Sequence, residues 1–155
     1  MTQTSSFAML QQLAEQRRDD WTRALGTLLA QLDEAKNRLQ LLVDYRNDYQ
    51  GRLERAVRGG IQGEGLRNYQ SFLANLEVAI EQQTSVLGGL RQQETKVRRA
   101  IANEQRQVES FSVLQKRRAN AETVRENRRT QAQQDEFAMN SVIRLAAKRD
   151  GQGDD

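Results

Sequence analysis

Arginine is the residue through which this chain could do most of its chemistry, because the 155-residue sequence contains neither histidine nor cysteine. Histidine is the commonest general base at neutral pH, and cysteine supplies thiolate nucleophiles and metal ligands. The glycine-rich stretch RGGIQGEG at 58–65 lacks the lysine of a phosphate-binding loop of the GxxxxGK[ST] type. Carboxylates are plentiful, but no spacing singles out an acid–base pair or a metal site. The sequence therefore predicts a protein that is not an enzyme and needs no cofactor.

The densest positive charge lies in QKRRANAETVRENRRT, residues 115–130. Six positive side chains oppose two carboxylates there, which gives +4 over sixteen residues, against +3 for the whole chain. Aromatic residues do not interleave with these arginines as single-stranded nucleic acid would require, and no helix-turn-helix or zinc module accompanies them. We predict a protein socket with an acidic lining, while a solvated face and a nucleic-acid arm remain the alternatives. The cluster comprises Lys116, Arg117, Arg118, Arg125, Arg128 and Arg129.

Two heptad repeats organise the elements that carry these residues. From Trp21 to Ala56, and again from Leu66 to Phe111, mostly apolar residues recur at alternating steps of four and three. This is the coiled-coil repeat, and the absence of proline allows long helices. The glycines at 58–65 interrupt the pattern, because an interior glycine costs roughly 1 kcal/mol against alanine. We predict an all-α fold with a helix over about 5–57, a turn over 58–65 and a longer helix over about 66–147.

Folding the chain at this turn pairs the two repeats as an antiparallel coiled-coil hairpin. Facing core residues, which we call the seam, then have numbers that add to a constant value. A parallel homodimer and a three-helix bundle are the alternatives. We expect a single domain over residues 1–150, a disordered tail at 151–155, and a second helix without a partner in the chain from about Lys116. The facing pairs include Leu53 with Tyr69, Leu32 with Leu90, Trp21 with Ile101 and Arg18 with Glu104.

Four of the eight aromatic residues lie between positions 45 and 72. Tyr49 and Tyr69 are seam residues in this register, so we expect them to fill the coiled coil near its turn. Tyr45 and Phe72 each precede the first core position of a heptad, which places both on one flank of the coil. Flanks are usually charged, so an aromatic flank indicates a partner surface, although these residues could also only shield the core. Ala79, Val86 and Arg38 continue this flank.

No segment predicts secretion or membrane insertion. The N-terminus, MTQTSSFAMLQQ, has no basic start followed by an apolar core, and no run of about 18 apolar residues occurs in the chain. The absence of cysteine suits a reducing compartment. We therefore expect a protein that meets a membrane only through its partners.

Three segments together resemble the FliJ family of the bacterial flagellar export apparatus. They are VDYRNDYQ before the turn, NYQSFLANLEVAIEQQ after it, and RENRRTQAQQDEFA near the end. They occur in the family's order and at its distances, and the resemblance extends over about residues 5–148. It implies a cytoplasmic protein at the inner face of the inner membrane at the flagellar base, similar to the gamma stalk of rotary ATPases.

The resemblance also implies partners. The ends of the coiled coil, with the arginine cluster, would bind the hexameric export ATPase FliI, alone or with FliH. The protein would also escort export chaperones and bind the cytoplasmic domain of the export gate protein FlhA. A YscO-like stalk of a virulence-type secretion system and a basic nucleic-acid-binding coiled coil are the alternative functions. The implied gate-binding residues are Leu42, Tyr45, Tyr49, Phe72, Leu76 and Ala79, and we add Arg38 and Gln83, which border this surface.

Overall fold

Two long helices make up nearly all of the computed structural model, which describes residues 2–153 and, within them, the side chains of residues 6–153. Helix α1 spans Thr2–Arg58 and helix α2 spans Glu64–Asp150. With 57 and 87 residues, they confirm the predicted all-α fold and the longer second helix. After α2, residues 151–152 form a turn, and residues 154–155 of the predicted tail lie outside the described part of the chain.

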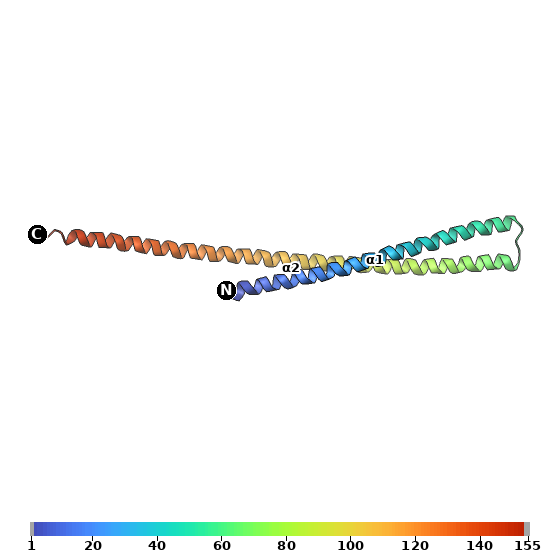
Figure 1. Ribbon diagram of the computed structural model, residues 1–155, viewed down its shortest axis with the longest axis horizontal. Helices are drawn as coiled ribbons and strands as arrows, with labels where there is room; N and C mark the ends of the chain where they lie inside the picture. Colours follow the sequence, from blue (N-terminus) through green and yellow to red (C-terminus); the bar gives the residue numbers. More distant parts are fainter. Residues whose placement is uncertain (1, 154–155) are drawn as a thin grey trace. The chain divides into compact units, whose positions relative to one another are not determined.

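The chain divides into two compact units. The first, which we call the hairpin unit, comprises Ala14–Arg106, and the terminal unit comprises the residues up to Leu13 and from Gln107 onward. Within the hairpin unit, α1 and α2 lie side by side and run antiparallel from the turn that joins them (Figure 1). The single domain over residues 1–150 stays a prediction.

The apolar seam holds the hairpin unit together. Its buried core contains residues from both helices that the predicted register brings face to face, and Leu32 there is only 4% exposed. Burying a leucine side chain of this kind contributes about 1.5–3 kcal/mol relative to leaving it in water. The core consists of Leu28, Leu32, Ala35 and Leu87, with Leu39, Leu90 and Val97 packed against it.

Polar side chains in the seam also cross between the helices. Gln83 Nε2 donates a hydrogen bond of 3.1 Å to the carbonyl oxygen of Ala35. Arg46 Nη1 lies 3.4 Å from Glu77 Oε1. Sliding one helix past the other would separate each donor from its acceptor, so these contacts favour one register of the coil.

In the predicted register Arg18 faces Glu104, but its hydrogen bonds go to other residues. Arg18 Nη2 lies 3.2 Å from Asp19 Oδ1, and Nη1 donates to Gln105 Oε1 at 3.0 Å. Glu104 Oε2 is buried and has no hydrogen-bond partner within the part of the chain that the structure describes. A long arginine side chain extends from the seam toward the flank, so it reaches the residue that follows the facing core position.

Two glycines with positive φ shape the turn. Gly60 (φ 92°) ends α1 in a Schellman motif, in which the amides of Gly60 and Ile61 donate to the carbonyls of Val57 and Ala56 at 3.1 and 3.0 Å. Gly63 (φ 68°) precedes α2, and its carbonyl accepts from the Arg67 amide at 3.1 Å. Because these glycines fix the helix ends, residues 58, 64 and 65 belong to the helices although the sequence assigned them to the turn.

Replacing Glu104 with leucine is expected to stabilise the hairpin unit. The change removes a buried carboxylate oxygen that has no partner among the described residues and adds an apolar side chain to the seam. We expect the free energy of unfolding to rise by about 1 kcal/mol, measured by urea denaturation followed by circular dichroism. Glu94→Leu is the matched control, because Glu94 accepts a hydrogen bond from Arg98 Nε at 3.0 Å and should gain less. A lower free energy of unfolding for Glu104→Leu would contradict this account of the seam.

Candidate functional site

An aromatic patch lies near the turn in the hairpin unit. It is formed by Tyr49, Tyr69 and Phe72, whose rings are in contact, and by Tyr45, one helical turn before Tyr49 on α1. The ring centroid of Tyr49 lies 4.2 Å from that of Phe72 and 5.7 Å from that of Tyr69, with the rings tilted in both pairs. Tyr49 and Tyr69 are half-buried, whereas Tyr45 is 53% and Phe72 42% exposed. The ring contacts restrain Phe72, so the patch presents an ordered apolar surface.

A hollow of about 360 Å³ opens in this patch between Tyr49, Tyr69 and Phe72, and Asn68 and Gly65 complete its lining. Gly65 allows the side chain of Ile61 to pack closely against the start of α2, because a Cβ atom at position 65 would lie 2.8 Å from Ile61 Cδ1. The hollow is lined mostly by rings and carries no charged side chain. It can therefore accept an apolar side chain of a partner, with Asn68 as a hydrogen-bonding group at its edge.

The other residues of the predicted gate-binding surface differ in their solvent exposure, and so in their accessibility to a partner. Leu76 is 8% exposed, and Leu42, Ala79 and Gln83 are half-buried. Leu76 therefore packs beneath this surface and leaves almost nothing for a partner to touch. Arg38 is exposed, and its Nη2 atom lies 2.8 Å from Glu34 Oε1 on the same helix.

The arginine cluster lies on α2 in the terminal unit. Arg118 is half-buried, with its guanidinium carbon 5.5 Å from the centroid of the Phe7 ring on α1. From residue 119 to residue 150, every side chain except Ser141 is exposed. The remaining cluster residues form no ion pair with any residue that the structure describes, so their charge is available to a partner. These residues are Lys116, Arg117, Arg125, Arg128 and Arg129.

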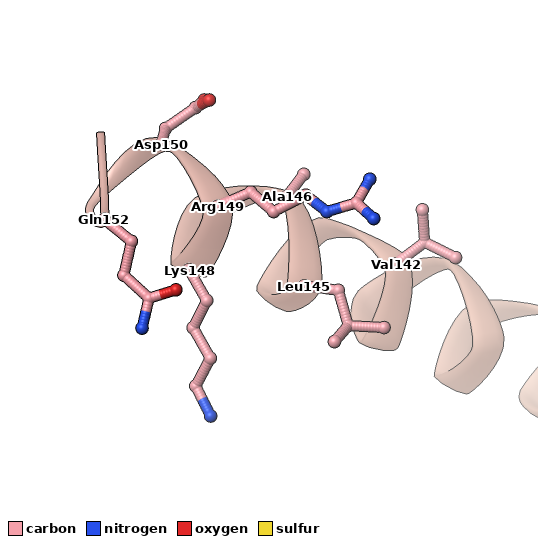
Figure 2. Close-up of a pocket in the computed structure, with 7 residues that line it drawn as sticks. All are labelled: Val142, Leu145, Ala146, Lys148, Arg149, Asp150 and Gln152. Carbon is pink, nitrogen blue, oxygen red and sulfur yellow. The ribbon is translucent and has the colours of Figure 1, made fainter.

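A second hollow, of about 580 Å³, lies along the C-terminal end of α2. Figure 2 shows Val142, Leu145 and Ala146 on one helix, with the Lys148 side chain extending away from the helix and the Arg149 side chain running back past Ala146. The lining comes only from this end of α2 and the residues just after it, so the hollow is an open helix face bordered by two cations, Lys148 and Arg149, and one carboxylate, Asp150. This arrangement suits contact with an acidic protein surface and lacks the enclosed shape of a substrate site.

Clusters of metal-binding side chains do not occur among the described residues. Nowhere among residues 2–153 do three or more acidic side chains gather closely enough to hold an ion. In the same part of the chain, neither helix contains a stretch apolar enough to cross a bilayer.

The family model of the flagellar FliJ protein matches residues 3–146, a span that includes both the aromatic patch and the arginine cluster. The chain belongs to the FliJ family. The FliJ protein of Salmonella typhi is 32% identical over 144 residues, which cover 93% of this chain and 98% of that relative. The FliJ protein of Escherichia coli strain K12 is 31% identical over the same length and the same shares. The resemblance found in the sequence is confirmed, and the chain is a FliJ-type flagellar export component.

Sequence reasoning missed one surface of this FliJ-family protein. The register places Trp21 in the seam, yet Trp21 is 41% exposed and lines a groove of about 520 Å³ with Leu28 and Val97. The neighbouring flank positions carry Ala24 and Ala100, whose side chains are too small to cover an indole ring. The small size of these flank residues is the signal that could have revealed the groove.

Truncating the exposed and the half-buried tyrosine of the patch should have different effects on stability. Tyr45→Ala is expected to change the free energy of unfolding by less than about 0.5 kcal/mol, because the side chain is mostly in solvent. Tyr49→Ala removes two ring contacts and should lower it by about 2 kcal/mol or more. Urea denaturation of both variants measures the difference, and equal losses would show that Tyr45 is a core residue.

Proposed function

We propose that this protein couples the flagellar export ATPase to the export gate. The observation that carries the proposal is the exposed arginine cluster on α2, where Arg125, Arg128 and Arg129 are all in solvent, on a chain that also exposes an aromatic patch near its turn. Most helical stability in proteins comes from packing, so a partner on this exposed segment would stabilise it. Two surfaces of different chemistry suit two different partners.

The arginine cluster binds the export ATPase FliI, alone or with FliH. Guanidinium groups form paired, charge-assisted hydrogen bonds with carboxylates, so an acidic lining in the ATPase ring would complement them. Arg125, Arg128 and Arg129 lie within five residues and are all exposed. Binding at this end biases the ring subunits toward assembly and ATP hydrolysis.

The aromatic patch binds the cytoplasmic domain of the gate protein FlhA. Tyr45 and Phe72 supply the exposed apolar area, and exposed aromatic side chains are typical of residues that dominate protein interfaces. Leu76 and Tyr49 support them from below. Arg38 and Gln83 border the contact.

The protein acts as a mechanical and allosteric link, catalyses no reaction of its own and requires no cofactor. It works on the cytoplasmic side of the inner membrane, reaches that membrane only through its partners, and escorts export chaperones. Both relatives are flagellar proteins, which favours the flagellar system over a virulence-type system.

The double variant Tyr45→Ala with Phe72→Ala is expected to weaken binding to the cytoplasmic domain of FlhA by about a hundredfold, because it removes both exposed rings. Isothermal titration calorimetry measures the dissociation constant, and circular dichroism checks that helicity is retained. Val78→Ala is the control, because Val78 is 53% exposed on the same helix outside the patch. Unchanged affinity in the double variant would exclude the patch as the gate-binding surface.

Reversing three charges in the cluster (Arg125, Arg128 and Arg129 to Glu) is expected to abolish most stimulation of ATP hydrolysis by FliI, because an acidic socket would then repel the helix. Turnover is measured across a titration of this protein. Reversing Arg91, Arg99 and Arg106 changes the net charge equally, elsewhere on α2, and should leave stimulation intact. Full stimulation by the cluster variant would contradict the ATPase contact. The nucleic-acid alternative would be favoured if the protein bound nucleic acid, if that binding weakened steeply as salt rises, and if the cluster variant lost it.

A further inference from the structure

One face of α2 in the hairpin unit carries almost no charge. We letter the heptad positions a to g, so that a and d form the seam. The flank that carries Phe72 then consists of the g and c positions. Between residues 65 and 106, α2 contains ten charged residues, but its twelve g and c positions hold only one of them, Lys96. Flanking positions of a coiled coil in water are usually charged, so this face is suited to contact with another chain.

The groove beside Trp21 lies on this face. Trp21, Leu28 and Val97 supply most of its apolar lining, together with Ala24 at a g position. The polar residues that line it are Thr27, Gln31, Gln93 and Lys96. Trp21 is the only tryptophan of the chain, and much of its indole is left in solvent. A third helix seated here would bury the indole and add to the seam of the coiled coil.

The free charge around the groove is positive. Lys96 lines it, and Arg17 occupies the g position one heptad before Ala24. Neither cation forms an ion pair with any residue the structure describes. Asp20, the carboxylate on the α1 side, is already paired with Arg23, whose Nη2 lies 2.7 Å from Asp20 Oδ1. A second copy of this chain would bring the same free cations to the contact, so an acidic partner is better matched.

We propose that this groove binds an amphipathic, acidic helix of a partner protein as a third strand of the coiled coil. Apolar side chains of that helix pack on Trp21, Leu28 and Val97, and its carboxylates meet Lys96 and Arg17. The groove lies about 35 Å along α2 from the aromatic patch, at 1.5 Å per residue between Phe72 and Lys96. The proposal does not depend on the coupling function.

Trp21 fluorescence in the full-length protein tests the proposal directly. The probe is a synthetic helical peptide of about three heptads with an alanine and leucine stripe bordered by glutamates. A second peptide is identical except that lysines replace the glutamates. We expect a saturable blue shift with the acidic peptide, and none with the basic peptide. Equal shifts with both peptides, or no shift at millimolar acidic peptide, would overturn the proposal.

Charge-reversal variants locate the site. Lys96→Glu combined with Arg17→Glu should weaken the acidic peptide about tenfold or more, since both free cations become repulsive. Arg99→Glu combined with Arg91→Glu makes the same change in charge on the other faces of α2 and should leave binding within about twofold. Tyr45→Ala should also leave it unchanged, which separates this groove from the aromatic patch. An equal loss of peptide affinity in the control variant would contradict the assigned site. A blue shift that grows with protein concentration without peptide, together with dimer formation in sedimentation, would show that a second copy of the chain occupies the groove.

Discussion

Burial of one apolar seam between α1 and α2 positions every exposed surface of the hairpin unit. Once Leu32, Ala35 and Leu87 are buried together, the rotation of each helix about its own axis is fixed. Residues that precede a core position then point to the same flank from both helices. For this reason Tyr45 on α1 and Phe72 on α2 contribute to one surface although 27 positions separate them in the sequence.

The polar members of the seam contribute specificity more than stability. Arg46 and Arg18 occupy equivalent heptad positions, and each reaches the residue after the facing core position, Glu77 and Gln105. Together with the bond from Gln83 to the α1 backbone, these contacts tie the register to particular partners. A fixed register matters here, because a shift of one heptad would separate the two halves of the aromatic patch.

Heptad spacing predicted the two helices, the turn and the buried leucines, since the period of apolar residues directly records which side of a helix is covered. It could not predict where long side chains end. The register places Arg18 opposite Glu104, but it does not show that the guanidinium bonds to Gln105. The exposure of Trp21 depends on the size of neighbours on both helices, and the stacking of Arg118 on Phe7 depends on the path of the chain near its N-terminus. Such features require three-dimensional coordinates.

The central claim is that one chain contacts the ATPase and the gate at the same time, through the arginine cluster and the aromatic patch. The most direct measurement is capture of the purified cytoplasmic domain of FlhA on immobilised FliI, with and without this protein. The account predicts capture only when this protein is present, because its two surfaces share no residue. Capture that does not require this protein, or FlhA that displaces FliI from it, would contradict the account.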